Sequence, residues 1–91
     1  MTHLTEPTTR EEIAKRLARV AGHATSLKRL WDEERDIDDM LTQIAAVRAG
    51  LDQVGKAMLE YHIEQRVAQA VERKNADEAI RSLKDALDRF V

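Results

Sequence analysis

Basic side chains gather in one segment of the chain, where they could bind phosphate. The segment from Ile13 to Leu30 holds five basic residues and no acidic one: Lys15, Arg16, Arg19, Lys28 and Arg29. Lysine and arginine that neutralise a DNA backbone can dominate binding affinity without a recognition helix. The run could instead be a solvated face, or it could complement acids of another subunit, because residues 36–72 hold seven acids against three bases. A phosphate-binding stripe is the most specific of these three hypotheses.

Other chemistry finds little support in the sequence. Asp36, Asp38 and Asp39 could form a carboxylate site, but the start of a helix attracts acids through the backbone dipole. The sequence shows no Gly-rich phosphate loop, nucleophile motif or H-E-x-x-H, and no helix-turn-helix, zinc-finger or leucine-zipper signature. The absence of cysteine excludes thiolate metal sites and thiol catalysis. We therefore predict that the protein is not an enzyme.

Three helices are expected to position these residues. Residues 1–8, with Pro7 and several threonines, are predicted to be a flexible arm. The first helix is expected over about residues 9–31, because Thr9 and Glu12 have the spacing of a capping box.

The second and third helices also have start signals. The second is expected over about residues 36–72 with Asp36 as its cap. The third is expected over about residues 76–90, behind a weaker capping pair formed by Asn75 and Glu78.

The second helix carries an apolar seam with alternating three- and four-residue spacing: Ile37, Met40, Ile44, Val47, Leu51, Val54, Met58 and Tyr61. This spacing is typical of helices that pack on other helices. A helix of about 36 residues is roughly 54 Å long, whereas a globule of this size is only about 30 Å across. We predict an all-α fold with three helices per chain, a very long central helix, a single domain over residues 9–91, and another copy covering the seam.

Composition sets the remaining bounds. The charged fraction of 35% suits a solvated helical surface, and the net charge is −2. The sequence has no run of about 18 consecutive apolar residues and no apolar segment near its start. We expect a cytoplasmic protein that does not associate with a membrane.

Three segments resemble the copper-sensitive operon repressor family (CsoR/RcnR/FrmR-like). They are Arg16-Leu17 through Val20-Ala21-Gly22-His23, Leu41-Thr42-Gln43-Ile44-Ala45-Ala46-Val47, and Met58-Leu59-Glu60-Tyr61-His62. The resemblance implies an antiparallel dimer of four-helix-bundle type that pairs again into a tetramer. It also implies binding to operator DNA through the first two helices, and release when an inducer occupies a site between subunits.

The resemblance places two DNA contacts on this chain. Arg16 falls where family members have a DNA-contacting arginine, and Lys56 falls where some members have arginine. Lys15, Arg19 and Arg48 are added as DNA-binding residues from the placement of charge alone.

The inducer site departs from the family pattern. Copper sensors have a cysteine, a histidine and a second cysteine where this chain has Ile37, His62 and Arg66. Nickel, cobalt, formaldehyde and persulfide sensors also need the first cysteine, and the supporting residues of the family are replaced by Asp36 and Ser82. Copper(I) prefers sulfur ligands, so copper is not expected here.

Nickel, cobalt or zinc could in principle bind His62 and His3, with Glu64 and Asp38 as further ligands. The arm Met1-Thr2-His3 resembles the nickel and cobalt branch. Arg66 would however place a positive charge beside such a metal and repel it. We therefore expect either an anionic effector or no effector, and we expect no cofactor.

The sequence therefore predicts a DNA-binding transcriptional repressor of this family that has lost its cysteine-containing inducer site. It is expected to act as a homo-oligomer, either dimer or tetramer. One alternative is a helical scaffold or adaptor that hetero-oligomerises with a related repressor. Another is a nickel-, cobalt- or zinc-responsive repressor that uses His62 and His3.

Overall fold

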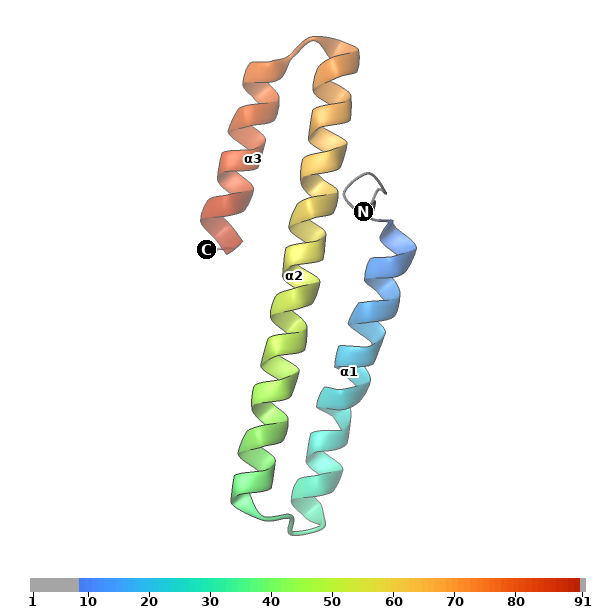
Figure 1. Ribbon diagram of the computed structural model, residues 1–91, viewed down its shortest axis with the longest axis vertical. Helices are drawn as coiled ribbons and strands as arrows, with labels where there is room; N and C mark the ends of the chain where they lie inside the picture. The colour runs from blue at the N-terminus through green and yellow to red at the C-terminus, as the bar shows by residue number, and fades with distance from the viewer. Residues whose placement is uncertain (1–8, 91) are drawn as a thin grey trace, which may run out of the picture. The chain divides into compact units, whose positions relative to one another are not determined.

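The structure is a computed structural model that describes residues 9–90, which form three helices joined by two short turns (Figure 1). Helix α1 spans Arg10–Asp32, α2 spans Ile37–Arg73 and α3 spans Ala76–Phe90. The described range contains no strand, so the prediction of an all-α chain with a very long central helix is confirmed. Helices α1 and α2 begin and end one residue later than expected, and none of the helices in the described range is long and apolar enough to cross a membrane. The expected arm over residues 1–8 lies outside the described residues.

Helix α1 ends in a Schellman motif, which turns the chain towards α2. The N–H of Arg35 donates to the carbonyl of Leu30 at 3.2 Å, and the N–H of Glu34 donates to the carbonyl of Trp31 at 3.0 Å. This motif needs a left-handed residue, usually glycine, directly after the helix. Glu34 takes that place with a φ of 60°, so the turn is formed at a conformational cost.

The starts of α2 and α3 are capped by the residues that precede them. The carbonyl of Asp36 accepts the first hydrogen bond of α2 from the N–H of Met40, at 3.0 Å. Lys74 has a φ of 56° in the turn before α3. The carbonyl of Asn75 then accepts a hydrogen bond from the N–H of Ala79 in α3, and Nδ2 of Asn75 donates to Oε2 of Glu78 at 3.2 Å.

The chain divides into two compact units, each built around a different part of α2. The first unit is Glu11–Val54, in which α1 runs antiparallel to the first part of α2 and Val20 packs against Gly50 (Figure 1). The second unit contains residues 55–90 and Arg10, and α3 there runs antiparallel to the last part of α2. The single domain expected over residues 9–91 stays a prediction.

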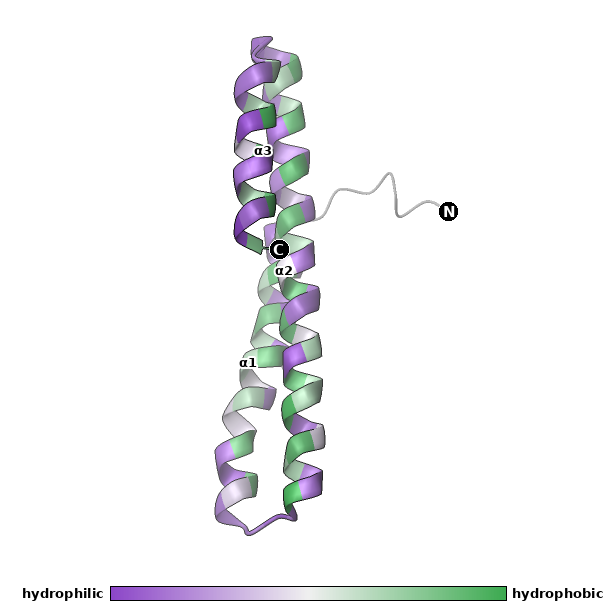
Figure 2. Cartoon of the chain, turned by 90° about the vertical axis from the view of Figure 1, so that its left-hand side faces the viewer, coloured by the Kyte–Doolittle hydropathy of each residue, from purple (hydrophilic) through white to green (hydrophobic). Residues whose placement is uncertain are grey.

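The apolar seam of α2 is divided into two rows of different exposure. In one row, Met40 and Val54 are buried, and Val47 and Tyr61 are half-buried. In the other row the side chains are largely exposed: Ile37 (54%), Ile44 (46%), Leu51 (53%) and Met58 (44%). These four residues are spaced by heptads, and we call them the exposed row. Apolar segments recur along the whole of α2 (Figure 2). The chain therefore covers only half of the seam by itself.

Candidate functional site

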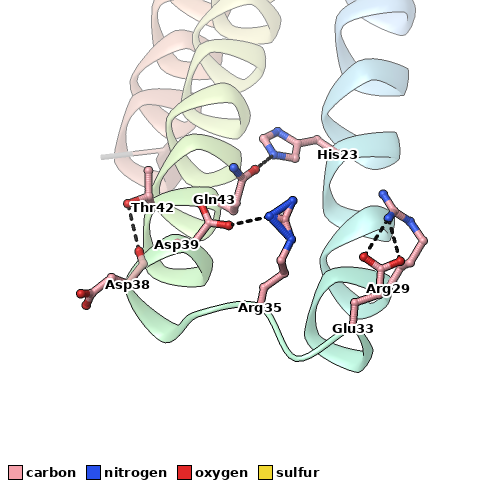
Figure 3. Close-up of polar contacts among 8 residues, drawn as sticks. All are labelled: His23, Arg29, Glu33, Arg35, Asp38, Asp39, Thr42 and Gln43. Atoms are coloured by element: carbon pink, nitrogen blue, oxygen red, sulfur yellow. Dashed lines mark hydrogen bonds and ion pairs between the residues drawn. The ribbon is translucent and has the colours of Figure 1, made fainter.

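The basic run of α1 is partly neutralised by acids that follow it. Nζ of Lys28 lies 2.7 Å from Oδ2 of Asp32, and Nη1 of Arg29 lies 3.2 Å from Oε2 of Glu33 (Figure 3 shows the second pair). Both pairs have the i, i+4 spacing that brings side chains together on a helix. These two basic residues are thus less available to an external phosphate than their place in the run suggested.

The other end of the run is more open. Lys15 has only a long contact with Glu11, in which Nζ lies 3.8 Å from Oε1. Arg16 and Arg19 are exposed and form no ion pair with any described residue. They lie three residues apart, which places them on neighbouring parts of one helical face. The most available cations of α1 are therefore these two arginines.

Helix α2 contributes two further exposed cations. The contact between Val20 and Gly50 places the two α1 arginines and Arg48 at the same level of the first unit, because each lies within about one helical turn of that contact. Lys56 belongs to the second unit. Neither Arg48 nor Lys56 forms an ion pair within the described part of the chain.

One carboxylate of the acidic cluster at the start of α2 has an ion-pair partner, and the backbone of the other two residues accepts hydrogen bonds. Nη1 of Arg35 donates to Oδ2 of Asp39 at 3.2 Å, and Oγ1 of Thr42 donates to the backbone carbonyl of Asp38 at 3.0 Å (Figure 3). The carbonyl of Asp36 caps the helix. Only the carboxylate of Asp39 is engaged by these contacts, so the interpretation of the cluster as acids at a positive helix end stays a prediction.

A polar contact also joins α1 to α2 inside the first unit. Nε2 of His23 donates to Oε1 of Gln43 at 2.7 Å, and both side chains are half-buried (Figure 3). Gln43 stands in the segment that carries the family resemblance. Its role in this structure is to pair two helices.

The predicted inducer residues fall in both units. Ile37 is the first residue of α2, whereas His62 and Arg66 lie one turn apart in its second half. Nε2 of His62 lies 3.4 Å from Oγ of Ser82 on α3, and Nη1 of Arg66 donates to Oε1 of Gln69 at 2.9 Å. A metal-binding histidine commonly has its second ring nitrogen held by such a partner.

The donor atoms around His62 do not fit copper. The chain has no cysteine, and the described residues contain no group of three His, Cys, Asp or Glu side chains that could hold a metal ion. His3, the second predicted ligand, lies outside the described residues. The part of the site that can be described offers one imidazole next to a guanidinium.

An open polar groove of about 350 Å³ extends from His62 and Arg66 along α3. Its α3 side is lined by Arg81, Ser82 and Arg89. The sequence prediction missed both of these arginines. Their helical spacing shows that they share a face of α3, but only the packing of α3 on α2 shows that this face meets His62.

The metal-sensitive transcriptional repressor family matches residues 9–89 of the chain. The copper-sensing transcriptional repressor CsoR of Bacillus subtilis is 31% identical over 81 residues, which are 89% of this chain and 80% of the relative. The copper-sensing transcriptional repressor RicR of Mycobacterium tuberculosis is 37% identical over 62 residues, which are 68% of this chain and 65% of the relative.

Two solved structures share the fold. The nickel-responsive transcriptional regulator InrS has a TM-score of 0.86 at 32% identity, over 98% of this chain and all of the other. The copper-sensing repressor CsoR with Cu(I) from Geobacillus thermodenitrificans has a TM-score of 0.76 at 36% identity, over 92% of this chain and 91% of the other. The family consists of transcriptional repressors rather than enzymes. The chain therefore belongs to the metal-sensitive transcriptional repressors, as a member without the cysteines of the usual inducer site.

Proposed function

We propose that this repressor acts in the cytoplasm and binds operator DNA as a homo-oligomer, with Arg16, Arg19 and Arg48 as its main phosphate contacts. The observation that carries the proposal is the pattern of ion pairs. Arg16 and Arg19 have no carboxylate partner among the described residues, whereas the later bases of the same run do. A cation without a partner in the protein can pair with a phosphate and release its condensed counterion without first breaking an internal ion pair. Lys15 adds charge to this surface, and Lys56 is a further proposed contact in the second unit.

The exposed row of α2 supports the oligomer. Four large apolar side chains at heptad spacing are 44–54% exposed in the single chain, and a second copy would bury them by helix packing. Two such chains side by side would give the antiparallel dimer of four-helix-bundle type, and a further pairing would give a tetramer. Repetition by symmetry would multiply the small set of basic residues on each chain.

The inducer site is proposed to be completed by the second copy. Ile37 begins α2 and His62 lies in its second half, so antiparallel packing of two α2 helices would bring Ile37 of one chain towards His62 of the other. The site would then contain an isoleucine and a guanidinium where copper sensors have two thiolates. Such a set suits neither copper(I) nor another cation.

A nickel-, cobalt- or zinc-responsive repressor is the second candidate. It is favoured by the likeness to the nickel-responsive regulator InrS and by Ser82, which supports the ring of His62. Arg66 disfavours it. Addition of Ni²⁺, Co²⁺ or Zn²⁺ to the complex with DNA tests this candidate, since only a responsive repressor would be released at stoichiometric metal.

Fluorescence anisotropy tests the proposed function directly. The full chain is titrated into labelled DNA from upstream of its own gene, with unrelated DNA of equal length as control, at about 0.15 M salt. We expect tight binding to the first DNA and at least about tenfold weaker binding to the second. Equal or absent binding to both would contradict operator binding and would favour the adaptor.

A further inference from the structure

The second unit contains two neighbouring grooves of opposite character. Beside the polar groove lies an apolar groove of about 510 Å³, whose walls include Met58, Leu59 and Phe90. Both grooves are lined by His62, Ala86 and Arg89. Because they share these side chains, they form one surface between α2 and α3, apolar at one end and polar at the other. We call it the double groove.

The polar end has an excess of positive charge. Three guanidinium groups line it, from Arg66, Arg81 and Arg89, against two carboxylates. One of these carboxylates, Glu78, accepts a hydrogen bond from Asn75, and the other, Asp85, forms no ion pair with any described residue. Arg81 and Arg89 also have no ion-pair partner in the described range. Arg89 is the important group, because it lines both ends.

We propose that the double groove binds an amphiphilic organic carboxylate, and that this ligand is the effector of the repressor. Its carboxylate would pair with Arg89 and Arg66 near His62, and its apolar body would cover Met58, Leu59 and Phe90. Arginine is well suited to this task, because its planar fork binds both oxygens of a carboxylate. The role as effector rests on the proposed operator binding.

The residues that line both grooves favour an amphiphilic carboxylate over an inorganic anion or a neutral apolar molecule. An inorganic anion would gain nothing from the apolar end of the double groove, where Leu59 and Phe90 form part of the wall. A neutral apolar molecule would gain nothing from the exposed guanidinium of Arg89 at the boundary. Only a molecule with both parts complements both ends.

Met58 provides a route from the ligand to the assembly. It lines the apolar end of the double groove and also belongs to the exposed row that a second copy would cover. A ligand in contact with Met58 would therefore change the packing of the row. The ligand would then bind the DNA-bound and DNA-free states of the oligomer with different affinity, and this difference is what allows an effector to change the affinity for DNA.

Isothermal titration calorimetry on the full chain tests the ligand class with three probes. Octanoate has both parts, octanol has the apolar body without the charge, and acetate has the charge without the body. We expect octanoate to bind at least about tenfold more tightly than either of the others, since a charge-assisted pair contributes about that factor. Equal binding of octanoate and octanol would overturn the proposal, and so would absence of octanoate binding.

Three variants place the ligand. Arg89→Gln should weaken octanoate binding about tenfold and leave octanol unchanged. Ala86→Leu should block both probes, because it fills the junction of the two grooves with a residue that helices accept. Lys84→Gln removes a charge from α3 outside both grooves and should change nothing. If the Arg89 and Lys84 variants bind octanoate with equal affinity, the proposed site is wrong. Light scattering during the titration adds a second check. If octanoate binds only after the oligomer has dissociated, the groove is closed in the assembled protein and the proposed site is also wrong.

The effector role is separated from the proposed function by repeating the DNA titration with octanoate. If the free protein binds its operator and octanoate weakens that binding, with less effect in Arg89→Gln, both proposals hold. If the operator binds equally well with octanoate bound, the effector role is overturned while operator binding stands. If octanoate binds but no operator binding exists without it, the proposed function fails and the groove remains a carboxylate site without the regulatory role.

Discussion

The ring of Phe90 on α3 lies against Gly55 of α2, at a place where α2 carries no side chain. A Cβ atom built on Gly55 would meet the ring at Cε1 and, 3.0 Å away, at Cζ. A glycine inside a helix lowers the stability of the helix by about 1 kcal/mol relative to alanine. The close approach of Phe90 accounts for the presence of glycine at position 55. This pair fixes how α3 is aligned with α2, and so brings Ala86 and Arg89 into the double groove.

Substitution of Gly55 by alanine is expected to raise the free energy of unfolding by less than the gain of about 1 kcal/mol that helix propensity alone would give. The ring of Phe90 must move to make room for the new Cβ atom, and because Phe90 is 47% exposed this movement offsets only part of the gain. Gly22→Ala is the matched control, because no atom lies within 4 Å of the Cβ position at Gly22 in the single chain. It should raise the free energy of unfolding by up to about 1 kcal/mol. Urea denaturation measures both, and an equal rise in the two variants would contradict the close packing of Phe90.

Arg16→Ala should weaken operator binding and reduce its dependence on salt. Each lost phosphate contact lowers the slope of log K against log salt by about one. Lys28→Ala is the control on the same helix, since Lys28 already pairs with Asp32 at 2.7 Å. Anisotropy titrations at several salt concentrations measure the slopes, and an unchanged slope in Arg16→Ala would remove this residue from the DNA interface.

The helices could be predicted from the sequence because their signals are local. Asp36 and Asn75 stand directly before α2 and α3, as their residue types suggest, and the seam of α2 has a period that only a helix satisfies. The pairing of Lys28 with Asp32 was missed. The basic run was defined only as far as Leu30 and the first helix was expected to end at residue 31, whereas Asp32 lies inside α1, four residues after Lys28.

The double groove could not be predicted, because it depends on contacts between residues far apart in the chain. Nothing in the residues around Gly55 states that Phe90 will pack there, and without that alignment Arg89 is one of many exposed arginines. His62 was found only through the family resemblance. Its contact with Ser82, at 3.4 Å, again required the position of α3.

Glu34→Gly is expected to stabilise the chain by about 1 kcal/mol. Glu34 has a φ of 60° at the end of α1, where a side chain is strained and glycine is not. Glu34→Ala removes the same carboxylate but keeps a Cβ atom, and should therefore give no such gain. Thermal and urea unfolding compare the two variants. If the free energy of unfolding changes by a similar amount in Glu34→Gly and Glu34→Ala, the effect comes from loss of the carboxylate charge and not from relief of backbone strain.

Ile37→Cys combined with Arg66→Cys should create copper(I) binding in a chain that has no cysteine of its own. The double variant supplies two thiolates, removes the cation beside His62, and leaves Ser82 to hold Nε2 of the imidazole. Competition with a copper(I) chelator should show one copper bound per chain. The control is Leu41→Cys with Arg66→Cys, which adds the same number of thiols with one displaced by a turn of α2. If the control binds copper equally well, the register implied by the family resemblance is wrong. If only the first variant binds, the loss of the inducer site is explained by these two positions alone.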